Sequence, residues 1–483
     1  MNRPAPSLRL RRILWAAVLV ALPVTNFRYF PLLGAATTVR PLSAYPLALL
    51  LIVLGWRWWR RREPFPWRNA LWPLCLFLLA WGVSTAFGAW LDPLPLRGQD
   101  YLDRALRAWV SLALGLAFFL ATIWMNQDEQ AIRFTLRWLM VGLLANLLWS
   151  LVQMIAFYTP WLPISTLREW QFSFSMRAPL QLRRVSGLTM EPSWLGAQMF
   201  TLYLPWFFAA LFERFSITGR RSWDALLGTL SVIVLLASYS RSGILITALT
   251  FVLALGLTAR AYLLQKWRWF WQGFRQGGGA FVLRLLLLLI VALLLSGAFL
   301  FLARHPYFAS LWNAPADDWR QYLVKIYAGP RAAYAISALA VWERSPLLGV
   351  GAGGAGFSMY RALPDWVLTF VPEISKHLAP TSNLFPNPKN LYVRLLTESG
   401  LLGFVLFFLF WLHLLADTLS LMRFSQTARA LARAALFFFI ATAFYHFTQD
   451  SLAQPDLWLI PGMVAGLLPP PQPQPQARPE NAR

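Results

Sequence analysis

The chain alternates long apolar runs with short polar segments, and this pattern predicts membrane-spanning helices. A helix that crosses a bilayer needs about 20 mostly apolar residues, and about twelve runs come near that length. The expected spans are residues 13–30, 42–56, 71–91, 109–125, 138–158, 194–212, 226–239, 243–263, 285–303, 400–416, 435–447 and 457–468. We therefore predict an all-α, polytopic membrane helix bundle of about twelve transmembrane helices.

One long stretch, residues 304–399, contains no apolar run long enough to cross a membrane. Its amphipathic parts, 318–327 and 331–341, predict short helices lying over the mouth of the bundle in one large extracytoplasmic loop. The expected organisation is nine helices in 1–303, this loop in 304–399, three helices in 400–468 and a tail in 469–483. Proline and glutamine alternate in the tail, which is typical of a disordered cytoplasmic segment.

Composition supports a lipid environment. Hydrophobic residues make up 58% of the 483 residues and charged residues 13%, against about 25% charged in soluble domains. The net charge is +23, but the basic residues flank apolar runs instead of forming a separate domain, so we expect the lipid bilayer and no nucleic acid as partner. The distribution of Lys and Arg in short loops predicts that both termini lie in the cytoplasm.

Few residues of this chain suit a metal or a cofactor. Cys75 is the sole cysteine, which excludes an intrachain disulfide and a cysteine metal cluster. The four histidines are scattered without zinc-binding spacing. We expect neither a cofactor nor a metal.

Cations that remain on the expected outer side need another explanation, and the first group begins with Arg183 and Arg184. Glu191, Pro192 and Ser193 follow where a span begins. Proline, serine and an acid all suit a helix start, which is a structural explanation. An acid at the edge of hydrocarbon is costly, which favours a functional role for Glu191 with the two arginines as partners.

A second polar group lies between two apolar runs and consists of Ser240, Arg241 and Ser242. A plain hairpin turn would explain the serines, whereas a guanidinium flanked by hydroxyls suits a phosphate, which arginine binds bidentately. Arg331 lies on an amphipathic stretch, so a solvated helix face is its simpler explanation. Glycines in 349–354 match a dinucleotide-binding spacing without the strand context that such a site needs, which favours a turn.

The last group surrounds the start of the span after the loop and contains Lys389, Asn390, Arg394 and Glu398. An interfacial collar is one interpretation, because Lys and Arg extend toward headgroups. Arg394 and Glu398 are four residues apart, so a local helix pair is also expected.

Taken in order over residues 183–403, these four patterns resemble the O-antigen ligase and O-antigen or exopolysaccharide polymerase superfamily of membrane glycosyltransferases. The resemblance implies inverting, metal-independent transfer from an undecaprenyl-diphosphate-linked oligosaccharide to a lipid A core sugar or to another carrier-linked glycan. It also implies that Arg241 and Arg331 hold the diphosphate, with Arg183 and Arg184 as helpers. Positioned guanidinium groups would stabilise the charge that develops on this leaving group.

One departure from the family pattern concerns Lys389. In the ligase branch a histidine precedes the asparagine of this motif and is proposed to activate the acceptor hydroxyl. A protonated lysine binds phosphate instead of acting as a base, so Glu191 becomes the alternative base. We favour a polymerase, with the ligase as the alternative within the class. A transporter of polysaccharide or lipid-linked glycan would require internal repeats and a polar midplane path.

Overall fold

The structure is a computed structural model that describes residues 6–29, 39–61, 63–177, 183–313 and 316–468. Within these ranges every regular element is a helix, and extended backbone pairs only in isolated bridges such as the one between Asn26 and Arg40. The expected all-helical fold is therefore confirmed. The predicted disordered tail lies outside the described residues.

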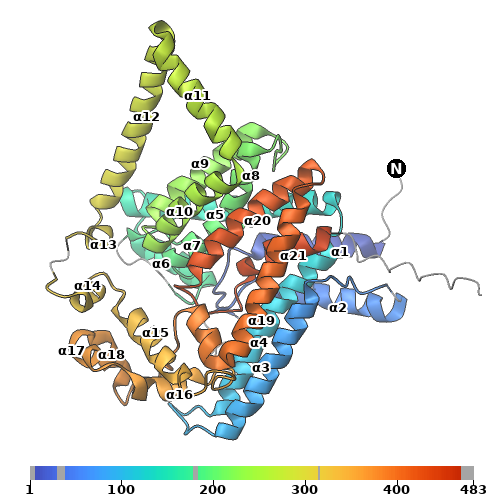
Figure 1. Cartoon of the computed structure of the whole chain (residues 1–483), viewed down its shortest axis with the longest axis vertical. Helices are drawn as coiled ribbons and strands as arrows, with labels where there is room; N and C mark the ends of the chain where they lie inside the picture. Colours follow the sequence, from blue (N-terminus) through green and yellow to red (C-terminus); the bar gives the residue numbers. More distant parts are fainter. Residues whose placement is uncertain (1–5, 30–38, 62, 178–182, 314–315, 469–483) are drawn as a thin grey trace, which may run out of the picture.

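The helices follow one another as the apolar pattern predicts (Figure 1). The first half contains α1 (Pro6–Ala21), α2 (Ala44–Arg61), α3 (Leu71–Leu91), α4 (Tyr101–Met125), α5 (Glu129–Tyr158), α6 (Ile164–Phe174), α7 (Pro192–Gln198), the π-helical turn η2 (Met199–Tyr203) and α8 (Leu204–Phe212). Then come α9 (Arg221–Ala237), α10 (Arg241–Thr258), α11 (Arg260–Gln276) and α12 (Gly278–Ala303).

The expected loop contains six short α-helices: α13 (Pro306–Ala309), α14 (Trp319–Lys325), α15 (Gly329–Trp342), α16 (Ala355–Met359), α17 (Asp365–Phe370) and α18 (Pro372–Leu378). The chain ends with α19 (Leu391–Leu421), α20 (Gln426–Tyr445), the 3-10 turn η4 (Pro455–Leu457) and α21 (Leu459–Leu467). The stretches 318–327 and 331–341, predicted to be short helices, correspond to α14 and α15.

Eight helical segments among the described residues are long and apolar enough to cross a membrane. They are α3, α4, α5, the continuous segment α7–η2–α8, α10, α12, α19 and α20. By this criterion the count is below the predicted number of about twelve transmembrane helices. Four expected spans correspond to α1, α2, α9 and α21, which do not meet the criterion. Of these, α1 has 16 residues, α9 has 17 and α21 has 9, so each is short for a complete crossing.

The bundle packs through close helix pairs and a large aromatic interior. α3 packs along α19, α4 along α21, α20 along α8 and α10, and α1 along α2 and α5. Trp15, Phe118 and Trp458 are fully buried. Glycine permits the α4–α21 approach, since a Cβ at Gly462 would lie 2.6 Å from the Thr122 Cβ. Close approach at small residues is the usual way in which helices gain packing energy in a bilayer.

The helices of 304–399 have a small core of their own, built from Tyr334, Val341, Met359, Ile374 and neighbours. This segment returns to the bundle at Gly400, where α19 is kinked with φ of 62°. A Cβ at Gly400 would lie 2.1 Å from the Leu347 carbonyl oxygen, so only glycine allows the turn to pack there. α19 itself begins at Leu391, so the helix starts before the predicted boundary at 399–400.

The α11–α12 hairpin extends away from the rest of the chain (Figure 1). Only 6% of the most apolar window of α12 is buried, and that window has a mean hydropathy of 3.0. Because α12 has few protein neighbours, lipid must cover most of it if it spans a membrane.

Candidate functional site

Arg241 lies in the first turn of α10. Ser240 is buried and caps this helix by accepting a hydrogen bond from a backbone amide. The Arg241 guanidinium donates through Nη1 to the Ile326 carbonyl oxygen (2.8 Å) and through Nη2 to the Ser310 hydroxyl. Its central carbon lies 3.9 Å from the centre of the Tyr307 ring. The predicted turn is therefore a helix start whose arginine contacts the α13–α14 segment.

Arg184 reaches the same aromatic ring from the loop that precedes α7. Its guanidinium donates to the carbonyl oxygens of Ser238 (3.2 Å) and Tyr239 (3.4 Å) at the end of α9. It lies 4.2 Å from the centre of the Tyr307 ring. The Arg184 and Arg241 guanidinium groups therefore both make cation–π contacts with this ring. Burial lowers the pKa of the Arg184 guanidinium, because removal from water disfavours the charged form.

Glu191 occupies the N-cap position of α7 without a side-chain capping hydrogen bond, and its carboxylate does not pair with the two arginines that the sequence suggested. It forms an ion pair with Arg177 (3.0 Å) and accepts a hydrogen bond from the Ser193 hydroxyl. Arg184 interacts with Glu191 only electrostatically, because the Arg184 donors are used at the end of α9. Arg183 is exposed. The expected pairing was wrong, and residue 177 supplies the partner.

Arg331 lies in the first turn of α15 and is exposed. Its Nη1 donates to the Thr448 carbonyl oxygen at 3.4 Å, beyond the end of α20. Arg184 interacts electrostatically with Glu191 and with Arg241, while Arg331 and Glu191 share the Tyr445 hydroxyl as an electrostatic neighbour. We call Arg184, Arg241 and Arg331 the arginine cluster.

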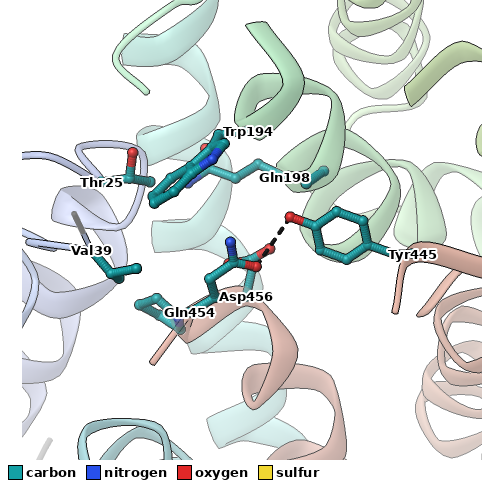
Figure 2. Close-up of a pocket in the computed structure, with 9 residues that line it drawn as sticks. Thr25, Val39, Trp194, Gln198, Tyr445, Gln454 and Asp456 are labelled. Carbon is teal, nitrogen blue, oxygen red and sulfur yellow. Dashed lines mark hydrogen bonds between the residues drawn. The ribbon is translucent and has the colours of Figure 1, made fainter. Parts of the chain in front are cut away.

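A small pocket lies directly behind the start of α7, and Figure 2 shows its polar lining. The Tyr445 hydroxyl donates to Gln454 Oε1 (3.1 Å), and Asp456 accepts from the Thr201 hydroxyl (3.1 Å). Gln198 Oε1 is buried and has no donor among the described residues. The lining comprises Thr25, Val39, Trp194, Ala197, Gln198, Tyr445, Gln454, Pro455 and Asp456. The polar lining of this pocket therefore consists of hydroxyl, amide and carboxylate groups, without a cation.

In the group at the start of α19, which contains Lys389, Asn390, Arg394 and Glu398, the arginine has a carboxylate partner. Arg394 pairs with Glu398 (3.1 Å), as the spacing predicted, and donates to the Asp450 carbonyl oxygen (2.7 Å). The Lys389 backbone amide donates to the Asp450 carboxylate (3.0 Å), and Asn390 caps α19. We call Arg394, Glu398 and Asp450 the paired cluster.

Several residues at this site could not be found from local patterns. Tyr307 and Tyr445 connect the arginines across long separations in the chain. His377 on α18 shares a hydrogen bond of 2.8 Å with the Tyr334 hydroxyl. Burial lowers the pKa of His377, and the nearby Lys389 acts in the same direction. Only contacts between distant segments identify these residues.

The helices and the arginine cluster define a multi-pass membrane protein with a cationic site where the 304–399 segment meets the bundle. Residues 226–408 match the family described as O-antigen ligase, and this match supports the resemblance to the O-antigen ligase and polymerase superfamily. The matched range includes Arg241, Arg331 and Lys389, whereas Arg184 and Glu191 precede it. No curated protein matches the chain. Members of this family are enzymes that transfer glycosyl groups, and the match therefore supports the prediction that this protein is an enzyme.

Proposed function

We propose that this enzyme transfers or polymerises glycans from an undecaprenyl-diphosphate carrier at the outer face of the bacterial inner membrane, with both termini in the cytoplasm. The family match supports glycosyl transfer. The diphosphate is held by Arg241, Arg331 and Arg184, with the exposed Arg183 as a further contact. Ser240 supports this arrangement by capping α10, and Ser242 follows Arg241 in the same turn.

The observation that carries the proposal is an excess of positive charge around Glu191. Arg177 forms an ion pair with Glu191, and Arg184 interacts electrostatically with Glu191 and with Arg241. Arg331 and Glu191 both interact electrostatically with the Tyr445 hydroxyl. The Arg241 Nε is buried and has no acceptor among the described residues. A buried cation without a full set of acceptors is costly, and a bound diphosphate would supply the missing oxygens.

The chemistry follows from this arrangement of charges. An acceptor sugar hydroxyl attacks the anomeric carbon of the donor from the face opposite the diphosphate. The new glycosidic C–O bond forms, the bond from the anomeric carbon to the diphosphate oxygen breaks, and the diphosphate leaves on the polyprenyl chain. The arginine cluster stabilises the leaving charge, and no metal is needed for this role.

The acceptor proton must pass to a base, and we propose Glu191 for this step. Glu191 interacts electrostatically with Arg184 of the arginine cluster, and 28% of its side chain is exposed. The carboxylate can therefore be reached from water. Lys389 would contact phosphate as a cation, while Asn390, Arg394 and Glu398 position the start of α19.

Polymerase activity is favoured over ligase activity because Lys389 stands where the ligase branch has histidine. In the test, the purified full-length protein is incubated with an undecaprenyl-diphosphate oligosaccharide, alone or with lipid A core. Longer carrier-linked chains support the polymerase, and glycan on lipid A core supports the ligase. Unchanged donor in both incubations would contradict glycosyl transfer. If the ligase is correct, Lys389→His should increase transfer to lipid A core.

A separate comparison tests the proposed base. Glu191→Gln should abolish transfer while the affinity for the donor is retained, because the amide cannot accept the proton. Arg177→Gln is the matched control, since it removes the same ion pair and keeps the carboxylate. If Glu191→Gln retains full turnover, another residue is the base.

A further inference from the structure

The α11–α12 hairpin contains a groove that the glycosyl-transfer site does not use. Its volume is about 720 Å³. The lining is apolar apart from two cations on α11, and it comprises Arg260, Leu263, Leu264, Lys266, Trp267, Trp269, Phe270 and Leu288. A groove that is apolar along its length and cationic at particular points fits an amphiphile better than a sugar or a nucleotide.

All charged residues of the α11–α12 hairpin are basic. Residues 259–303 contain Arg260, Lys266, Arg268, Arg275 and Arg284 and no aspartate or glutamate. Three tryptophans of α11, at positions 267, 269 and 271, are exposed among these cations. Basic residues interleaved with tryptophan are typical of helices that lie against anionic headgroups.

Arg284 supplies a third cation beside the groove. It is only 8% exposed, and its guanidinium lies 4.2 Å from the centre of the groove-lining Trp269 ring. Its Nε is buried and has no acceptor among the described residues. Gly273 makes room for it, because a Cβ there would lie 2.0 Å from that Nε. Arg284 Nη1 donates to the Ala280 carbonyl oxygen (3.1 Å), and no anionic partner pairs with this guanidinium within the part of the chain that the structure describes. The hairpin thus holds a buried cation next to an apolar groove.

We propose that this groove binds one anionic phospholipid, with an acyl chain against Leu264, Phe270 and Leu288 and the phosphate near Arg260 and Lys266. Charge complementarity favours this occupant. A second copy of the chain would bring two basic hairpins together, and like charges would repel. A zwitterionic lipid would fill the apolar surface and leave the net positive charge uncompensated. The proposal is independent of glycosyl transfer.

The experiment measures the first lipid bound to the purified full-length protein by native mass spectrometry. The probes are dioleoyl phosphatidylglycerol and dioleoyl phosphatidylcholine, which have the same acyl chains. We expect tighter binding of phosphatidylglycerol, and Arg260→Gln/Lys266→Gln should weaken it about 30-fold, since each cation near an anionic headgroup contributes about fivefold. Arg220→Gln/Arg221→Gln removes two exposed charges outside the groove and should leave binding unchanged.

Two further measurements separate the acyl chain from the phosphate. Leu288→Trp fills the groove and should weaken phosphatidylglycerol binding although every cation is retained. Glycerol phosphate, which lacks acyl chains, should not displace the lipid at equal concentration. Equal binding of the two lipids, equal loss in the control variant, displacement by glycerol phosphate, or a dimer that excludes lipid would each overturn the proposal.

Discussion

The arginine cluster and the paired cluster both lie where the 304–399 segment meets the bundle, and they differ in how their charges are compensated. In the paired cluster, Arg394 binds Glu398 at 3.1 Å and the Asp450 carbonyl oxygen at 2.7 Å. In the arginine cluster, Arg241 and Arg184 contact backbone carbonyls and one aromatic ring, and no carboxylate lies within ion-pair distance of either among the described residues. In sequence, both clusters are arginines near the ends of apolar runs. In the structure, an arginine paired with a carboxylate has a structural role, whereas an arginine without a carboxylate partner is available to an anionic ligand.

The largest expected effect concerns the arginine cluster. Arg241→Gln and Arg331→Gln should each lower kcat by about 10²–10³-fold, because each removes a donor that stabilises the leaving diphosphate. Turnover of the purified variants checks this, and the melting temperature should remain near that of the wild type. Arg220→Gln is the control, since Arg220 is exposed and outside both clusters. A loss of folding in Arg241→Gln would assign Arg241 to the structural class.

The opposite behaviour is expected of the paired cluster. Glu398→Gln should lower the free energy of unfolding by about 2–3 kcal/mol, because it leaves the Arg394 guanidinium largely buried without its counter-charge. The melting temperature in detergent measures this loss. The double variant Arg394→Met/Glu398→Met removes both charges and should recover part of the stability. Equal stability of Glu398→Gln and wild type would show that the pair contributes little.

A smaller effect is expected at the ring that Arg184 and Arg241 share. Tyr307→Leu removes the aromatic face under both guanidinium groups and should weaken donor binding by about fivefold, as a cation–π contact contributes about 1 kcal/mol. Tyr307→Phe retains the ring and should bind the donor like the wild type. The KM for the donor distinguishes the two variants, and an identical increase in both would assign the effect to the hydroxyl.

The smallest effect is a pH dependence of stability at His377. Its pKa in the folded chain lies below its ordinary value because of burial, so the unfolded chain binds the proton more readily. His377 therefore contributes a stability that is present above about pH 6.5 and is lost as the pH falls toward the folded-state pKa. Melting curves at pH 7.5 and 5.5 should show a smaller acid-side decrease for His377→Gln than for the wild type. The same decrease in both would contradict this assignment.

Local signals predicted much of the fold. The expected span 71–91 coincides with α3, and the Arg394–Glu398 pair follows from one helical turn of spacing. Of the four helices that stand in place of expected spans, α1, α9 and α21 are short. In the expected span 457–468 a 3-10 turn precedes α21, and hydropathy does not register such an interruption.

The site was only partly accessible from sequence. Arg241 was predicted as a site residue because an arginine between two apolar runs is unusual, and its contacts with Ser310 and Ile326 could not be predicted. The Arg177–Glu191 pair and the shared Tyr307 ring depend on the path of the loops between helices. Neither has a periodic signal, because the partners approach only after the bundle and the 304–399 segment have packed together.

The most direct test of the central claim is the affinity of the purified protein for undecaprenyl diphosphate, compared with undecaprenyl monophosphate. The arginine cluster predicts tighter binding of the diphosphate by the wild type, and a loss of that preference in Arg241→Gln/Arg331→Gln with Arg220→Gln unchanged. Equal affinity of the double variant and the wild type for the diphosphate would contradict a diphosphate site at these arginines.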